Sequence, residues 1–95
     1  MLFTDRQKPL FPLGQVVMTH GANEAAGGLA NAFDLLLKHV AGDWGDLDLE
    51  DIQANEDALS SGARLLSSYA LPSGTVWIIT EADRSITTIL TPSEY

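Results

Sequence analysis

The chain has 95 residues, with 13 acidic and 5 basic side chains, a net charge of -8 and no cysteine. Its length fits one domain with one core, and the missing cysteine excludes disulfides, thiolate metal sites and thiol nucleophiles. The negative charge disfavours direct binding to nucleic acid or to an anionic membrane, and it favours a basic protein partner. Since we find neither a membrane-length apolar run nor a signal-peptide pattern, we expect a cytoplasmic protein.

The first half of the chain predicts a lead-in segment, a strand and two helices. Residues 1–13 hold two of the 4 prolines without a clear period, so we assign them to an N-terminal arm and residues 14–95 to a single domain. The β-branched run within residues 14–20 predicts a strand, with a sheet edge as one location. Residues 22–30 predict a short helix that breaks near Gly27 and Gly28, because glycine disfavours helix.

A second helix is predicted over residues 31–40, with Asn31 as its N-cap and Gly42 at its end. Four residues at helical spacing form its expected inner stripe: Phe33, Leu36, Leu37 and Val40. Residues 39–47 then form a glycine-containing corner. An acidic helix follows, begun by Asp46 or Asp48 and ended by Gly62, with Asn55 on or near its inner stripe and four residues in apolar contacts: Leu49, Ile52, Ala58 and Leu59.

From residue 63 the apolar period changes to two, and turns at residues 72–74 and 82–84 separate three short strands. The fold class we predict is α+β: about three helices packed on a three- to four-stranded antiparallel sheet, in the order β-α-α-α-β-β-β. Both faces of the strands carry apolar residues. We therefore expect the second face to be covered by the arm or by a second subunit, which leaves a homodimer open.

Two blocks of the sequence resemble a family of small bacterial proteins called plasmid-related, some of which carry a restriction-modification label. The first block contains His39, Gly42, Asp43, Trp44, Gly45, Asp46, Glu50, Asp51, Ala54, Asn55, Glu56, Ala58 and Leu59, and the second runs from Trp77 to Ser85 and on to Tyr95. The resemblance implies a mobile genetic element as the source and implies no reaction. The chain departs from the family pattern at His20 and at Gly27 and Gly28, and it lacks the glycine-rich cofactor loop of a methyltransferase.

The acidic run is the main candidate for function, because residues 43–57 hold seven of the 13 acids and no Lys or Arg. One interpretation is a solvated helix face with acidic caps. The other, which we adopt, is a non-enzymatic binding protein of a mobile element that docks on a basic protein surface. Its partner could be a nucleic-acid-handling host defence complex, as for anti-CRISPR or anti-restriction inhibitors. The candidate partner-binding residues are Asp43, Trp44, Asp46, Asp48, Glu50, Asp51, Glu56 and Asp57.

Competing interpretations concern the same corner. Trp44 fits a core plug as well as an interface anchor. His39 fits a helix-end residue that interacts with the dipole or with Asp43, or the base of a small hydrolase oriented by Asp43 or Asp46. An obligate dimer with a structural role is a third class. The spacing of Asp46, Asp48 and Glu50 imitates a calcium loop without its glycine, so we expect no metal and no cofactor.

Overall fold

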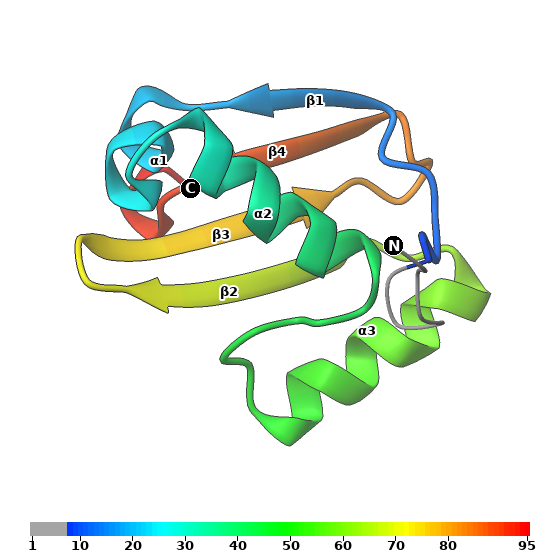
Figure 1. The fold of residues 1–95 in the computed structure, drawn as a ribbon. Coiled ribbons are helices and arrows are strands. Elements are labelled where there is room, and N and C mark those ends of the chain that lie inside the picture. Colours follow the sequence, from blue (N-terminus) through cyan, green and yellow to red (C-terminus); the bar gives the residue numbers. More distant parts are fainter. Residues whose placement is uncertain (1–7) are drawn as a thin grey trace.

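The computed structural model describes residues 8–95 and contains three α-helices and a four-stranded sheet (Figure 1). In chain order the elements are β1 (Gln15–Met18), α1 (His20–Ala26), α2 (Leu29–Val40), α3 (Leu49–Ser61), β2 (Leu65–Leu71), β3 (Gly74–Thr80), β4 (Ile86–Leu90) and the 3-10 turn η2 (Pro92–Glu94). The predicted α+β class and the predicted order of elements are confirmed. None of the described helices has the length and apolarity to cross a bilayer.

The strands lie in the order β1-β4-β3-β2. The pairs β2–β3 and β3–β4 are antiparallel, as the short turns between them require. β1 is parallel to β4, so the sheet is mixed rather than antiparallel throughout. All three helices lie between these two strands in the chain, and such a long connection allows the parallel pairing that a tight turn forbids. β1 occupies one edge of the sheet and β2 the other.

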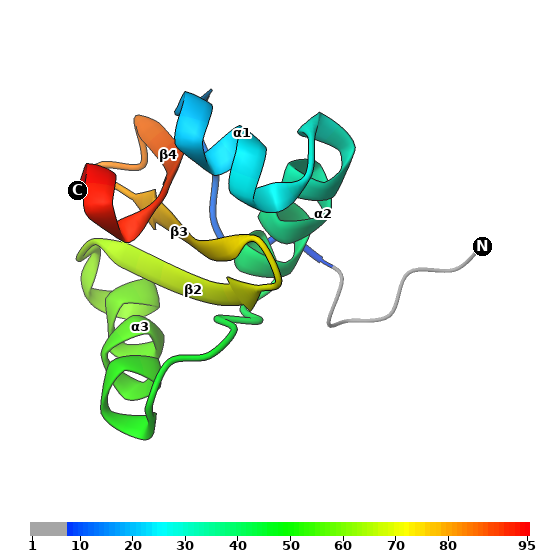
Figure 2. The ribbon, with the colours of Figure 1, turned by 90° about the vertical axis from the view of Figure 1, so that its left-hand side faces the viewer.

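The helices divide between one face and one edge of the sheet. Figure 2 shows α1 and α2 together on one side of the strands, with α3 beyond β2 and away from them. The main core lies under α1 and α2, and its buried members are Ala22, Ala25, Ala26, Ala32, Leu35, Leu36, Tyr69, Val76, Ile78 and Ile89. A second cluster joins α3 to the corner and contains Phe11, Val40, Trp44, Ala58 and Leu65.

The C-terminus packs on the second face of the sheet. The Trp77 and Tyr95 rings meet edge to face with centroids 5.7 Å apart, and the Arg64 guanidinium lies over the Tyr95 ring. Glu94 accepts hydrogen bonds from the Thr19 hydroxyl (2.6 Å) and from the backbone N–H of Thr91. These bonds hold the pKa of Glu94 below its usual range. The chain's own end, rather than its arm, therefore lies over part of this face.

α2 differs in detail from the prediction. It begins at Leu29 with Gly28 as N-cap, and Asn31 lies inside the helix, where its side chain donates to the Gly27 carbonyl (3.2 Å). The expected inner stripe is half wrong, because Phe33 and Leu37 are 55% and 51% exposed. The residues of α2 that face the sheet are Ala32, Leu35, Leu36, His39 and Val40. Burial of His39 turns the helix about its axis and moves the apolar residues of one flank outward.

α3 begins and ends as predicted, with Asp48 as N-cap and Gly62 as C-cap. The Asp48 carboxylate accepts from the Asp51 N–H (2.9 Å). Asn55 is buried, whereas Leu49 is 84% exposed and makes none of the expected core contact. The helix buries only a narrow stripe, so most of its surface faces solvent.

The described part of the predicted arm belongs to the domain. The backbone N–H of Leu10 donates to the carbonyl of Val40 (2.8 Å), and the Phe11 side chain is buried. Phe11 stacks on Trp44 with ring centroids 6.2 Å apart. The boundary at residue 13 is therefore too late, and residues 1–7 of the arm lie outside the described residues.

Candidate functional site

The predicted corner lies along the free edge of β2. In an edge strand every second residue presents its N–H and C=O outward. At Ser68, the N–H donates to the Trp44 carbonyl (3.1 Å) and the C=O accepts from the Asp46 N–H (2.7 Å). Residues 44–46 thus pair with β2 at Ser68 only, as an isolated β-bridge.

Side chains close the edge on both sides of this bridge. The Ala70 N–H donates to the Asp46 carboxylate (2.7 Å). Asn55 of α3 donates from its amide nitrogen to the Leu66 carbonyl (2.6 Å) and accepts from the Leu66 N–H (3.1 Å). Both outward groups of Leu66 and Ser68 and the N–H of Ala70 are thereby bonded, which blocks strand addition here.

Close approach of the corner to β2 depends on Gly45. Its φ is +78°, a conformation that side chains with a Cβ rarely adopt. A Cβ built at Gly45 collides with the Ser68 carbonyl and with the Tyr69 ring. The glycine that the sequence placed beside Trp44 therefore allows backbone-to-strand contact.

Trp44 is a core residue and does not contact a partner in this arrangement. Its side chain is 4% exposed, and its indole N–H donates to the Glu56 carboxylate (2.8 Å). The nearby Tyr69 hydroxyl donates to the Asp43 carbonyl (2.6 Å), and burial raises the pKa of Tyr69. The interpretation of Trp44 as a partner-binding residue is therefore corrected to that of a plug that holds the corner on the sheet.

The seven carboxylates of residues 43–57 are all exposed, but they are not equivalent. Five accept hydrogen bonds from described groups: Asp43 from Gly45 N–H, Asp46 from Ala70 N–H, Asp48 from Asp51 N–H, Glu56 from Trp44 and Asp57 from Gln53. Glu50 and Asp51 extend from the first turn of α3, where their charge favours the helix end. Between described residues, no ion pair neutralises any of the seven.

His39 does not meet the predicted carboxylates. Its ring is fully buried, with Nδ1 2.6 Å from Ser67 Oγ and Nε2 2.9 Å from Thr80 Oγ1. Neither Asp43 nor Asp46 bonds to it, so the hydrolase arrangement is not formed. His39 lies in the last turn of α2 as predicted, but the expected interaction with Asp43 is not formed, because hydroxyl groups of the sheet draw the ring inward.

The proton positions around His39 follow from the bonds themselves. Thr87 Oγ1 donates to the Leu13 carbonyl (2.7 Å) and so accepts from Thr80 Oγ1 (2.8 Å). Thr80 has then used its only proton and must accept from His39 Nε2–H. The Nδ1 atom is left to accept from the Ser67 hydroxyl. The neutral ring satisfies every bond, and burial lowers the pKa of His39 to about 4.

Arg84 ties the β3–β4 turn to the end of α3. Its guanidinium donates to the carbonyls of Ala63 (2.7 Å) and Ala58 (3.1 Å) and lies over the Phe11 ring. Unpaired carbonyls at a helix C-terminus attract a cation. No carboxylate of the corner takes part in this link.

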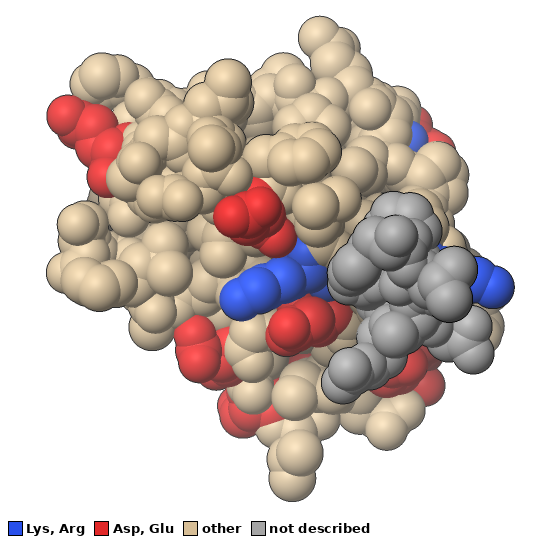
Figure 3. Space-filling view, viewed as in Figure 1, with Lys and Arg blue, Asp and Glu red and all other residues tan. Residues whose placement is uncertain are grey.

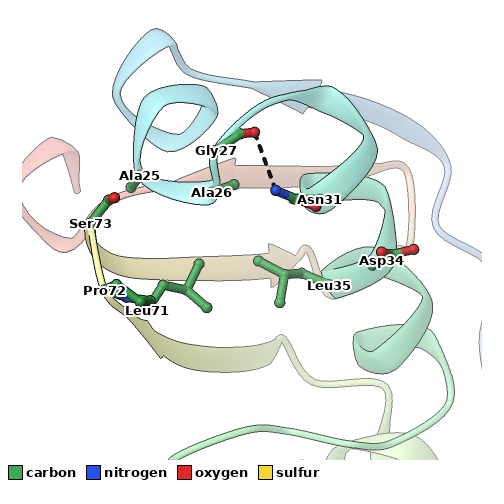
Figure 4. Close-up of a pocket in the computed structure, with 9 residues that line it drawn as sticks. All are labelled: Ala25, Ala26, Gly27, Asn31, Asp34, Leu35, Leu71, Pro72 and Ser73. Atoms are coloured by element: carbon green, nitrogen blue, oxygen red, sulfur yellow. Dashed lines mark hydrogen bonds between the residues drawn. The ribbon is translucent and has the colours of Figure 1, made fainter.

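A shallow pocket of about 440 Å³ opens between α1, α2 and the β2–β3 turn (Figure 4). It is lined by Ala25, Ala26, Gly27, Asn31, Asp34, Leu35, Leu71, Pro72 and Ser73. Asp34 is its only ionisable residue, and none of the predicted catalytic residues His39, Asp43 and Asp46 contributes to it. Across residues 8–95 no group of three or more His, Asp or Glu side chains is placed to hold a metal ion.

Sequence reasoning placed Asn55 on or near the inner stripe of α3 but missed three other polar residues that matter to this site. Asn55, Ser67, Thr80 and Thr87 are all buried and hydrogen-bonded. Their signal was a polar residue at an inward position of an otherwise apolar pattern. Comparison of the chain with models of protein families, with curated proteins and with solved structures gives no match.

Proposed function

We propose that this chain is a non-enzymatic binding protein that docks an acidic face on a basic surface of a protein partner. The acidic face consists of the seven exposed carboxylates of Asp43, Asp46, Asp48, Glu50, Asp51, Glu56 and Asp57. The observation that carries the proposal is their exposure on one continuous segment without a Lys or Arg. Such a single-signed surface attracts a basic partner over a distance and repels an acidic one.

The fold supports docking because it holds much of the acidic face in place. Five of the seven carboxylates accept hydrogen bonds, and Asp46 is fixed to the backbone of β2. A carboxylate that is already ordered loses little conformational entropy when it meets a basic side chain. The acidic face is therefore partly preorganised for binding.

An exposed apolar side chain lies among these charges. Leu49, the first residue of α3, is 84% exposed and stands between Asp48 and Glu50. Apolar contact inside a charged rim adds affinity that salt does not screen. In this proposal Leu49, and not the buried Trp44, supplies the apolar contact of the acidic face.

The partner that best fits this chemistry is a nucleic-acid-handling protein, whose basic groove normally accepts phosphates. Fixed carboxylates can occupy such a groove in place of the phosphates. The resemblance to plasmid-related proteins adds a mobile-element setting, in which the partner would be a host defence complex of CRISPR or restriction type. Under this proposal the protein acts in the cytoplasm as an inhibitor and neither binds nucleic acid directly nor performs a reaction.

The test uses carboxylates that the fold does not need. Glu50 and Asp51 accept no hydrogen bond from described side chains or backbone, so a Glu50→Lys/Asp51→Lys variant should fold normally. Tagged wild-type and variant proteins are used to capture proteins from bacterial lysate at low and at moderate salt. We expect the wild type to retain a basic protein, more weakly as salt rises, and the variant to lose it. Added double-stranded DNA should release the same protein.

A matched control separates the acidic face from net charge. A Glu24→Lys/Asp34→Lys variant has the same net charge, but its changes lie on α1 and α2, where both side chains are exposed. We expect this variant to bind as the wild type does. Equal loss in both variants, or capture that neither salt nor DNA weakens, would contradict docking through the acidic face.

A further inference from the structure

β1 leaves the opposite edge of the sheet open. The N–H of Gln15 donates to the Ser85 carbonyl (3.0 Å), and the N–H of Thr19 donates to the Ile89 carbonyl (2.9 Å). Every second residue from Gln15 therefore points its N–H and C=O toward β4. Val16 and Met18 therefore present their N–H and C=O groups outward. No group within residues 8–95 bonds to them. Unlike β2, this strand has no corner, side-chain amide or carboxylate from the described residues bonded along its edge.

Charged side chains are few along β1, and one of them is Glu94, whose carboxylate accepts from the Thr19 hydroxyl next to the strand. Residues 9–23 contain no Asp, Glu, Lys or Arg. Figure 1 places β1 and α3 at opposite ends of the molecule, and in Figure 3 the surface over β1 and the upper part of α2 is nearly free of charged residues. This is where two copies of a chain with a net charge of -8 can approach with the least repulsion.

Apolar side chains stand on the same face as this open edge. Val16 pairs in register with Thr87, so its side chain points to the α2 side of the sheet, where it is 42% exposed. Along the outer flank of α2, Leu29, Phe33 and Leu37 recur at i, i+4 and i+8 and are 73%, 55% and 51% exposed. An open edge beside exposed apolar groups is a site for strand addition.

We propose that the occupant of this edge is a second copy of the chain, with β1 of each subunit paired antiparallel to the other. A two-fold axis midway between Val17 and Val17 of the partner subunit places Val16 opposite Met18 of the partner subunit, and Met18 opposite Val16 of the partner subunit. Each of these two pairs exchanges both N–H···O=C bonds, because outward groups face each other. Four hydrogen bonds join the two sheets into one of eight strands.

A second copy fits this edge because the uncharged strand lets two chains of net charge -8 meet without repulsion between facing side chains of the strand. Its two outward residues lie symmetrically about Val17, so a two-fold axis satisfies every outward group in both subunits. The axis also carries the two acidic faces to the far ends of the dimer. The inference is independent of the proposed function, since it uses none of the acidic residues.

Sedimentation of the full-length protein over a wide concentration range tests the proposal. We expect the wild type to approach twice the chain mass of 10.2 kDa as concentration rises. Val16→Pro removes an outward N–H without touching the β1–β4 ladder and should keep the protein monomeric. Val16→Lys, which leaves the backbone intact, should do the same. Leu49→Lys makes a similar change on the exposed end of α3 and should leave the dimer unaffected.

Hydrogen exchange shows whether a dimer uses β1. The amides of Val16 and Met18 should exchange fast in dilute protein and become protected in concentrated protein, while the Val17 amide stays protected in both. A wild type that stays monomeric at millimolar concentration overturns the proposal. So does a dimer that survives both Val16 variants, or one in which the Val16 and Met18 amides remain fast.

Discussion

The two edges of the sheet are treated in opposite ways. Along β2, the corner backbone and the Asn55 amide bond both outward groups of Ser68 and Leu66, and the Asp46 carboxylate bonds the N–H of Ala70. Along β1, the described chain provides no such bonds. A free edge invites pairing with another strand, and natural proteins usually block it. The contrast indicates that the acidic segment has a structural role at β2, and that β1 is left available.

A line of buried polar groups connects the two edges. It runs from Ser67 of β2 through His39 to Thr80 of β3 and Thr87 of β4, and it ends at the Leu13 carbonyl just before β1. Each group donates to the next, so the line has one direction. Because every group is satisfied, it fixes how α2 sits on the sheet.

The largest expected effect comes from a substitution at the closest contact between the corner and β2. Gly45→Ala forces a Cβ into the Ser68 carbonyl, so we expect the free energy of unfolding to fall by about 3 kcal/mol or more. Gly62→Ala is the matched control, because Gly62 has a similar φ of +80° and open space around it. It should cost only about 1 kcal/mol. Urea unfolding of both variants measures the difference, and equal costs would show that the corner does not lie this close to β2.

The next effect concerns the line of buried polar groups that connects the two edges, and it is a change of stability with pH. Folded His39 stays neutral down to its lowered pKa of about 4, while in the unfolded chain the same ring binds a proton below its ordinary pKa of 6.5. Stability therefore falls as pH drops from 6.5 to 4, by up to about 3 kcal/mol from this residue. His39→Gln keeps one donor and one acceptor but does not titrate. The free energy of unfolding, measured between pH 6.5 and pH 4, should fall less steeply for the variant than for the wild type. Parallel curves would contradict the assignment of a neutral, buried His39.

A third, smaller effect comes from removing the side-chain hydrogen bonds at one position of the β2 edge. Asn55→Ala leaves the N–H and C=O of Leu66 without partners under α3, and we expect it to cost about 2 kcal/mol. Gln53→Ala, an exposed change on the same helix, should be nearly neutral. Thermal unfolding of the two variants provides the comparison. A stable Asn55→Ala protein would mean that water replaces the amide without loss.

The smallest effect separates carboxylates that support the fold from those left free. Asp48→Ala removes the N-cap bond of α3 and should cost about 1 kcal/mol. Glu50→Ala, two residues on, removes only a charge near the helix end and should cost a few tenths of a kcal/mol. If both variants unfold at the same temperature, the carboxylates of the acidic face do not differ in how much they stabilise the fold.

Much of the fold was predictable from local patterns. The two-residue period of β2 to β4, the turns around Pro72 and Asp83, and the caps Asp48 and Gly62 depend on neighbouring residues, and all are confirmed. The parallel pairing of β1 with β4 was not predictable, because it joins segments some 70 residues apart. The rotation of α2 was missed for the same reason, since hydroxyl groups on distant strands bury His39.

The residue types of the candidate site were predictable from the sequence, but the contacts that these residues make were not. The sequence showed seven acids and a glycine-flanked Trp44, yet it could not show that Asp46 bonds the edge of β2 or that Trp44 is buried. These roles depend on β2, which follows the corner by about 20 residues. Asn55 gave the one local signal, a polar residue on an inner helix stripe.

Residue-resolved hydrogen exchange at two protein concentrations tests the contrast between the edges most directly. The account predicts that the outward amides of Leu66, Ser68 and Ala70 are protected at both concentrations, because the chain itself bonds them. It predicts that the Val16 and Met18 amides are protected only in concentrated protein. Fast exchange at Leu66, Ser68 and Ala70, or the same behaviour at both edges, would contradict it.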